Sequence, residues 1–203
     1  MIDFITDRFV IIIVSIMAIL GIVIRICGIN VISDDMSVYF LPWYEEIKSS
    51  GKLLALKYQV GNYSVIYQMI IALFTYLPVK AIYLYKMLSI IFDYLLATAA
   101  AMLLYRIKGN KVISSMVFIA CIMLPTMVLN SSYWGQCDSI YTAFILYSLL
   151  LLYQKRYTGA FILLGVAFSF KFQMIFILPF YIYFYFFSKR FSVINFLWIP
   201  FTT

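Results

Sequence analysis

The chain has 203 residues, of which 66% are apolar, 20% aromatic and only 11% charged. Soluble domains carry about 45–50% apolar and about 25% charged residues, so this chain has too few polar residues to cover a soluble core. The composition also excludes disordered, collagen-like and disulfide-scaffolded proteins. We therefore expect residues 1–203 to form one all-α module, a polytopic membrane helix bundle whose solvent is the lipid bilayer.

The charge balance is basic, because 15 Lys and Arg against 8 Asp and Glu give a net charge of +7. A basic chain often binds nucleic acid, but here the cations form short clusters between apolar segments, a pattern that indicates membrane topology. We therefore expect no nucleic-acid partner. The chain has no histidine and its three cysteines lack the spacing of a metal site, so we expect no metal and no cofactor.

The apolar segments between these clusters predict the membrane spans. We expect spans over residues 9–27, 81–105, 112–129, 140–153, 158–170 and 173–187, with the start of another from residue 191. Asp3 and Asp7 precede the first segment, which therefore lacks the cationic start of a secretory signal and should remain as a helix. The apolar run over residues 159–187 is too long for one span and is interrupted at Lys171.

Residues 28–80 are expected to form one outer loop with surface or re-entrant helices. Aromatic and aliphatic residues recur there at helical spacing and predict an amphipathic juxtamembrane helix: Tyr39, Phe40, Trp43, Tyr44 and Ile47. The apolar run over residues 63–78 is shorter than the about 20 residues of a span. If this run does not cross, every cationic cluster falls on one side, which the positive-inside rule makes cytoplasmic. The outer side then holds this loop, residues 130–139 and the turn at Lys171.

Two carboxylates stand just outside the first span. Asp34 is a favourable N-cap residue, and Asp35 would lie in the first helical turn, where the helix dipole favours an ionised carboxylate. Such a carboxylate at the membrane surface can accept a proton from a hydroxyl group. A plain capping pair is the alternative interpretation, and position alone favours it.

The loop over residues 130–139 is polar, aromatic and glycine-bearing. Trp134 with the nearby Gln136 and Asp138 suits sugar recognition, because a ring packs on C–H faces while amides and carboxylates bind hydroxyls. The alternative is an aromatic belt in which Asp138 caps the next helix, and the residues leave both interpretations open.

Three further charges lie within apolar segments. Lys171 needs a partner, either an anionic headgroup such as a lipid phosphate or, by snorkelling, water at the interface. Lys86 and Asp93 are seven residues apart, on one helix face. We favour a structural ion pair there, which Arg25 could share, over a proton relay.

The order of these features resembles the C-type (GT-C) integral-membrane glycosyltransferases, and among them bacterial proteins similar to the second mannosyltransferase of the GPI-anchor pathway. The likeness runs from about residue 9 to residue 190. The segments that carry it are Ser33-Asp34-Asp35-Met36, Leu41-Pro42-Trp43-Tyr44, Gly61-Asn62-Tyr63, Tyr133-Trp134-Gly135-Gln136-Cys137-Asp138-Ser139-Ile140, Gly159-Ala160-Phe161 and Lys171-Phe172-Gln173 through to Pro179.

The resemblance implies a sugar transfer from a polyprenyl-phosphate donor to a glycan or lipid acceptor hydroxyl, with inversion, at the extracytoplasmic face of the plasma membrane. The family's first-loop aspartate is the general base, which here matches Asp35, with Asp34 as the alternative. Residues matched to substrate binding are Asn62, Tyr63, Trp134, Gln136, Asp138, Lys171 and Gln173.

Two other interpretations remain open. Relatives in this superfamily are usually longer, so a C-terminal half or second subunit could complete the site, or the chain could be an inactive, truncated stub. A polytopic transporter or flippase would concentrate polar groups at mid-membrane and show two related halves. Only Asp93 and Lys86 lie deep in a predicted span, and no repeat is visible.

Overall fold

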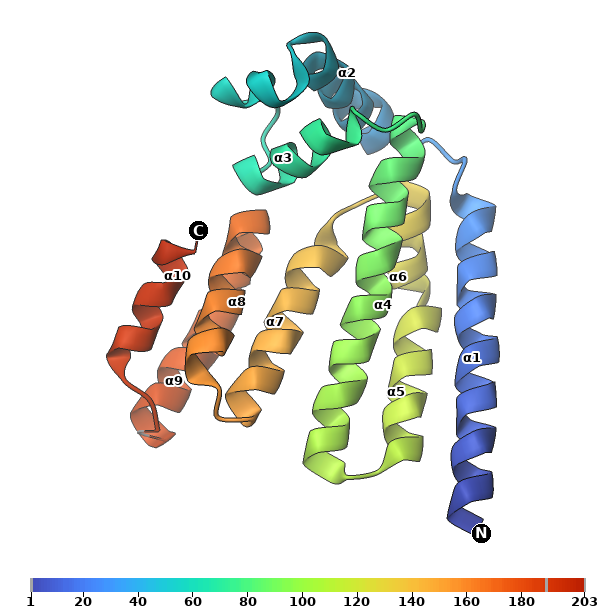
Figure 1. Cartoon of the computed structure of the whole chain (residues 1–203), viewed down its shortest axis with the longest axis vertical. Helices are drawn as coiled ribbons and strands as arrows, with labels where there is room; N and C mark the ends of the chain where they lie inside the picture. The colour runs from blue at the N-terminus through green and yellow to red at the C-terminus, as the bar shows by residue number, and fades with distance from the viewer. Residues whose placement is uncertain (1, 189, 203) are drawn as a thin grey trace.

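The computed structural model describes residues 2–188 and 190–202, with side chains from Arg8 onward. Within these ranges the chain forms helices joined by short turns, and no β-strand occurs there, which confirms the all-α expectation. Long helices lie side by side, and a group of short helices covers one end of them (Figure 1). We call the covered end the upper end and the opposite end the lower end.

The upper-end cover follows the first helix, α1 (Ile2–Gly28). Its elements are the π-helix η1 (Met36–Phe40), α2 (Leu41–Ser49), the 3₁₀-helix η2 (Lys52–Lys57) and α3 (Val65–Phe74). The remaining chain forms α4 (Ala81–Lys108), α5 (Lys111–Met123), α6 (Pro125–Val128), η3 (Leu129–Trp134), α7 (Asp138–Tyr153), α8 (Tyr157–Phe170), η4 (Phe172–Ile177), α9 (Leu178–Ser188), η5 (Val193–Leu197) and α10 (Trp198–Phe201).

Two of the described helices are long and apolar enough to cross a membrane, the Arg8–Gly28 part of α1 and the whole of α4. A third span results if α5 and the segment Pro125–Trp134, bent by 47° relative to each other, are taken together. The bend falls at Leu124, which is extended because the residue before a proline avoids the helical conformation. The helices over the predicted spans 140–153, 158–170 and 173–187 are each shorter than a full span.

The long apolar run after residue 158 is divided at Lys171. Helix α8 ends at Phe170, Lys171 is extended with φ −153° and ψ 130°, and η4 begins at Phe172. The two arms therefore form a hairpin whose turn lies at the upper end (Figure 1).

A buried ion pair joins the helices near the upper end. Arg25 and Asp93 are both fully buried, and Nε and Nη2 of Arg25 donate to Oδ2 of Asp93 at 2.9 and 2.8 Å. Nη1 of Arg25 donates to the carbonyl of Ile122 at 2.8 Å, and the hydroxyl of Ser139 donates to Oδ1 of Asp93. This single cluster connects α1, α4, α5 and α7.

The expected pairing of Lys86 with Asp93 is wrong. The ammonium of Lys86 donates instead to the carbonyls of Gly28 and Val31, at 2.9 and 2.5 Å. These carbonyls belong to the end of α1 and the turn after it, where carbonyl groups lack partners within the helix. Asp93 takes Arg25 as its partner, and Lys86 fastens the exit of α1 to α4.

The upper-end cover has its own apolar core. Met36, Phe40, Tyr44 and Ile47 recur at helical spacing along η1 and α2 and are all buried. Phe40 stacks on Tyr85 of α4, with ring centroids 5.3 Å apart. This face holds the cover against the bundle and fixes the position of the loop that precedes it.

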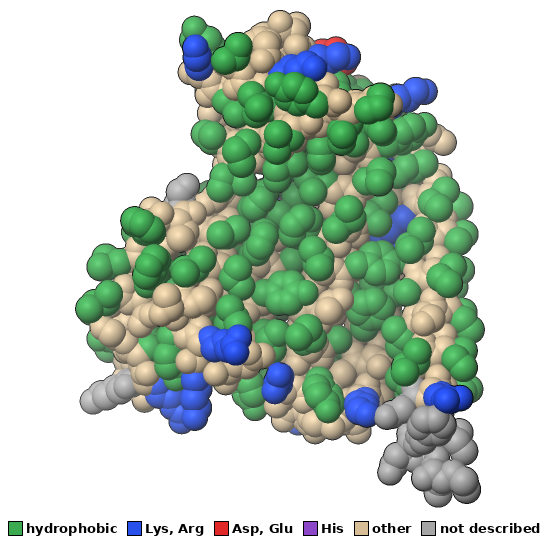
Figure 2. Space-filling view, in the orientation of Figure 1, with side chains coloured by type: hydrophobic (Ala, Val, Ile, Leu, Met, Phe, Trp, Pro, Cys, Tyr) green, Lys and Arg blue, Asp and Glu red, His purple; other side chains and the backbone are tan. Residues whose placement is uncertain are grey.

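The surface of the bundle is predominantly hydrophobic. The space-filling view shows a broad apolar face over the long helices, with Lys and Arg side chains gathered along the lower edge and at the upper end (Figure 2). Helix α1 exposes large apolar side chains along its length, including Ile11, Ile16, Ile19 and Ile26. Such a continuous apolar belt suits contact with lipid rather than with water.

We expect Asp93→Leu to destabilise the protein by about 3 kcal/mol or more, because it leaves the buried Arg25 charge without a partner. The measurement is unfolding in detergent, followed by circular dichroism. Lys48→Ala removes a partner from the exposed Lys48–Glu45 pair and should cost less than about 1 kcal/mol. The double variant Arg25→Met/Asp93→Leu should recover much of the loss; a double variant as unstable as Asp93→Leu alone would contradict this account.

Candidate functional site

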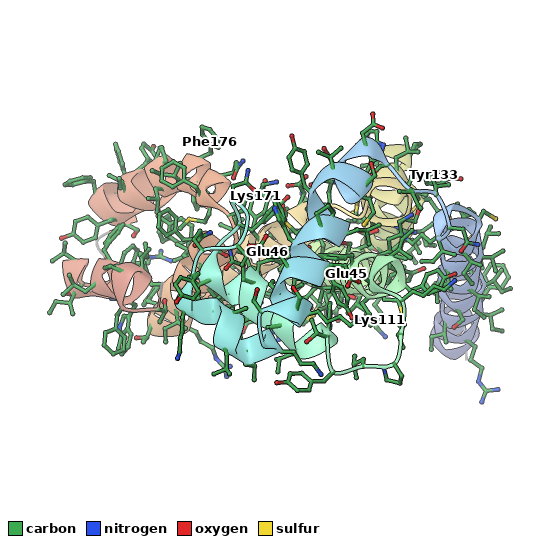
Figure 3. The ribbon with its side chains drawn as sticks, turned by 90° about the horizontal axis from the view of Figure 1, so that it is seen from above. Glu45, Glu46, Lys111, Tyr133, Lys171 and Phe176 are labelled. Carbon is green, nitrogen blue, oxygen red and sulfur yellow. The ribbon has the colours of Figure 1, made fainter. Side chains whose placement is uncertain are left out.

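Three segments that are far apart in sequence meet at the upper end. They are the turn before η1, the loop that leads into α7, and the break between α8 and η4. Seen from above, Lys171 lies on the side of the hairpin, while Tyr133 lies on the opposite side near α1 (Figure 3). Tyr133 packs there against Gly28, where a Cβ would fall 2.6 Å from its ring.

Ser33, and neither aspartate, caps the helix after the first loop. The Oγ atom of Ser33 accepts from the backbone N–H of Met36 at 3.3 Å and donates to the carbonyl of Trp134, also at 3.3 Å. Asp35 has helical backbone angles and makes no side-chain capping bond. The plain capping interpretation of Asp34 and Asp35 is therefore wrong, and the carboxylate of Asp35 is turned to another partner.

That partner is Gln136. Its Nε2 donates to Oδ2 of Asp35 at 2.5 Å, and its Oε1 accepts from the hydroxyl of Tyr63 at 3.2 Å. Burial, followed by the neighbouring Cys137, Asp138 and Asp35, raises the pKa of Tyr63 above its ordinary value. The phenol therefore stays protonated and acts as a donor. Because the nitrogen and the oxygen of the Gln136 amide each have a hydrogen-bond partner, the orientation of the amide is fixed.

Asp138 and Lys171 form the second polar contact. The ammonium of Lys171 donates to Oδ1 of Asp138, and Nδ2 of Asn130 donates to Oδ2 at 3.1 Å. Burial acts to lower the pKa of Lys171, but the hydrogen bond and charge of Asp138 outweigh it, so the pKa is raised. The carboxylate of Asp138 thus binds Lys171 and Asn130 and makes no capping bond at the start of α7.

Two cavities flank these contacts. The first, of about 440 Å³, we call the carboxylate cavity; its lining is Asp35, Thr126, Leu129, Asn130, Trp134, Gln136 and Asp138. The second, of about 680 Å³, we call the amide cavity; its polar lining is Gln59, Asn62, Tyr63, Ser64, Ser169, Lys171 and Gln173. The contacts Gln136–Tyr63 and Asp138–Lys171 each pair a residue that lines the carboxylate cavity with one that lines the amide cavity.

The predicted site residues divide between the two cavities. Asp35, Trp134, Gln136 and Asp138 line the carboxylate cavity. Asn62, Tyr63, Lys171 and Gln173 line the amide cavity. Asp34 is exposed and lines neither, so the structure separates it from the residues with which it was grouped.

Sequence reasoning missed several lining residues. Asn130 was considered only as the edge of a loop, although its amide binds Asp138. Ser64 immediately precedes the apolar helix α3, a position typical of an N-cap, yet its Oγ is buried without a hydrogen-bond partner beside the amide cavity. The serine before an apolar run was a usable sequence signal for Ser64. No sequence pattern indicated that the amide of Asn130 binds Asp138.

The site is fixed from below by the buried network. Ser139, next to Asp138, donates to Asp93, and Gly135, next to Gln136, lies against the Lys86 side chain. Gly135 has φ +70°, and a Cβ there would overlap the end of Met36, so the loop approaches α4 and η1 closely only because this residue is glycine. Within the described ranges no three His, Cys, Asp or Glu residues form a metal-binding group.

Comparison with known proteins gives no further assignment. No protein-family model, no curated protein and no solved structure matches the chain.

We expect Asp138→Asn to lower the pKa of Lys171, because burial then acts on the ammonium without a compensating carboxylate. More of the amine is neutral at about pH 9, so Lys171 should react faster with an amine-acylating reagent, measured by mass spectrometry of its peptide. The exposed Lys48 provides an internal control whose labelling should not change. An unchanged pH profile for Lys171 would show that Asp138 does not control its charge.

Proposed function

We propose that the chain is a membrane glycosyltransferase similar to the GT-C class, mannosyltransferase-like, which transfers a sugar from a polyprenyl-phosphate donor to the hydroxyl of a glycan or lipid acceptor. The observation that carries this proposal is a pair of cavities whose linings are in contact, one presenting the carboxylate of Asp35 and the other the ammonium of Lys171. The first suits deprotonation of a hydroxyl, and the second suits a phosphate leaving group.

The membrane placement follows from length, apolarity and charge. Helices α1 and α4 cross the bilayer, as does the bent pair that begins with α5, and the shorter helices from α7 to α9 complete a polytopic bundle. Arg106 and Lys108 at the end of α4 lie with Lys155 and Arg156 at the lower end, which the positive-inside rule makes cytoplasmic. The upper-end helices then lie at the extracytoplasmic surface of the plasma membrane.

Asp35 is the general base of this proposal. Gln136 holds Oδ2, so Oδ1 is left to accept the proton of an acceptor hydroxyl. As that proton leaves, the hydroxyl oxygen attacks the anomeric carbon, the bond from this carbon to the phosphate oxygen breaks, and its electron pair stays on the phosphate. Attack from the face opposite the phosphate inverts the configuration. Gln136 is a positioning residue, because it acts through Asp35.

The amide cavity is assigned to the donor phosphate. Lys171 supplies a cation, and the amides of Asn62 and Gln173 supply further donors. Ser64 adds a hydroxyl whose Oγ is buried without a hydrogen-bond partner. The first turn of α3, which follows Ser64 and has no side-chain cap, adds backbone N–H groups. A volume of about 680 Å³ lies within the usual range of small-molecule sites.

The carboxylate cavity is assigned to the acceptor and the transferred sugar. Trp134 lines this cavity and is half exposed, so the face of its ring can pack on the C–H face of a sugar. Asn130 and Asp138 line the same cavity, and their side-chain oxygens can accept hydroxyl protons. The fully buried charged groups of the described bundle, by contrast, are Arg25, Lys86 and Asp93, and all three are committed to internal partners, which does not favour a transport pathway.

We expect Asp35→Asn to lower the rate of sugar transfer by about 100-fold or more, because it removes the base without changing the shape of the side chain. The assay uses membrane vesicles that contain the full chain, a radiolabelled polyprenyl-phosphate mannose donor and a lipid extract as acceptor. Glu45→Gln, an exposed carboxylate of α2, should keep the wild-type rate. Asp34→Asn tests the alternative base and should also keep it.

Loss of transfer with Asp34→Asn alone would move the base to that residue. Equal rates for Asp35→Asn and the wild-type chain would exclude the proposed mechanism. Absence of transfer by the wild-type chain, with or without added membrane extract that could supply a second subunit, would favour the inactive-stub interpretation.

A further inference from the structure

A third polar cavity lies at the lower end, away from the proposed catalytic site. It occupies about 440 Å³ between the start of α8 and η5. Its charged and polar lining consists of Lys155, Arg156, Thr158, Ser192 and Asn195. The proposed sugar transfer uses none of these residues.

The charged side chains that line this cavity are both cationic. Lys155 and Arg156 are both exposed at its mouth, and Arg190 follows α9 nearby in the chain. Residues 139–203, which supply all of the cavity lining, contain no Asp or Glu. The cations Arg25 and Lys171 each face a carboxylate, whereas no carboxylate from α8, α9 or η5 can neutralise Lys155 and Arg156.

Hydrogen bonds and ring contacts hold the walls of the cavity in place. The hydroxyl of Thr158 donates to Oδ1 of Asn195 at 3.4 Å, and Nδ2 of Asn195 donates to the carbonyl of Ser192 at 3.0 Å. Phe191, which is 8% exposed, anchors this segment by packing on Tyr157 and Phe161 of α8, with ring centroids 5.2 and 5.3 Å apart. The polar groups are therefore set in a fixed frame rather than on a loose surface.

The backbone at the start of α8 adds N–H donors, which carry partial positive charge. The first N–H groups of α8, a helix of 14 residues, open beside the two cations, and its N-cap residue Arg156 makes no side-chain capping bond. Partial positive charge at a helix N-terminus reinforces anion binding where cations and hydroxyls already surround a cavity.

We propose that this cavity binds a phosphate group, carried by the headgroup of an anionic phospholipid or by a free phosphate compound. Arg156 offers a planar fork that matches phosphate oxygens, and Lys155 offers a second cation. The hydroxyl of Ser192 adds a further donor, the hydroxyl of Thr158 holds Asn195 in the wall, and Phe191 forms an apolar floor. The shared chemistry of both sources is a phosphate oxyanion, and binding at the lower end does not depend on the proposed transfer reaction.

The test compares the full chain with the double variant Lys155→Gln/Arg156→Gln. A matched control, Arg106→Gln/Lys108→Gln, removes two cations from the same end that do not line the cavity. One arm counts the phosphatidylglycerol and phosphatidylcholine molecules retained by the detergent-solubilised protein, by native mass spectrometry. The other arm measures binding of inorganic phosphate by calorimetry. We expect the double variant to lose about tenfold or more in affinity, and the control to lose less than about twofold.

Selective loss of phosphatidylglycerol supports the site and identifies a lipid source, whereas loss of inorganic phosphate supports it with a soluble source. An equal loss in the control variant would show general attraction to a basic surface and would overturn the proposal, as would a wild-type chain that binds neither. Thr158→Val keeps both cations and removes the hydroxyl that holds Asn195 in the cavity wall; a loss of about threefold in this variant supports the cavity itself even where the double variant does not fold.

Discussion

The carboxylate of Asp93 is the point on which the upper half of the bundle depends. It binds Arg25 of α1 with one oxygen and Ser139 of α7 with the other, and Arg25 extends the cluster to the carbonyl of Ile122 in α5. A charge buried in this way is tolerated only when partner and geometry are both satisfied. Four helices therefore share one arrangement, and the loops that leave them are positioned by it.

The buried cluster separates the charges that are committed to the fold from those that border cavities. The deep cations and the deep carboxylate are saturated by internal partners, whereas Asp35 and Lys171 lie at the ends of the helices and border cavities. One amide, that of Gln136, stands between the two cavities and bonds to a group on each side. A donor and an acceptor that met beside this amide would lie close to both Asp35 and Lys171, as the proposed transfer requires.

The helical content and the main breaks could be predicted from the sequence. Apolar runs gave the helices, and Lys171 marked an interruption because an ammonium is costly inside such a run. The partners of the charges could be predicted only in part. Arg25 was expected as a possible partner of Asp93, and the structure confirms that pair across 68 residues. The pairing of Lys171 with Asp138 across 33 residues was missed, because no local spacing encodes it. The seven-residue spacing that suggested Lys86 as the partner of Asp93 was misleading, because the ammonium of Lys86 binds the carbonyls of Gly28 and Val31 instead.

The separation of Arg25 and Asp93 along the chain also constrains how the protein is made. Arg25 lies in the last turn of α1 and leaves the ribosome 68 residues before Asp93, an interval of roughly 3–14 seconds at about 5–20 residues per second. In the proposed membrane setting, its guanidinium has to wait in the hydrated headgroup layer, which a long side chain at a helix end can reach. Helix α1 can then settle to its final depth only when α4 arrives. The ion pair would thus make the final position of α1 in the membrane depend on the insertion of α4. The loop of residues 29–80 would be translated before α1 reaches that position.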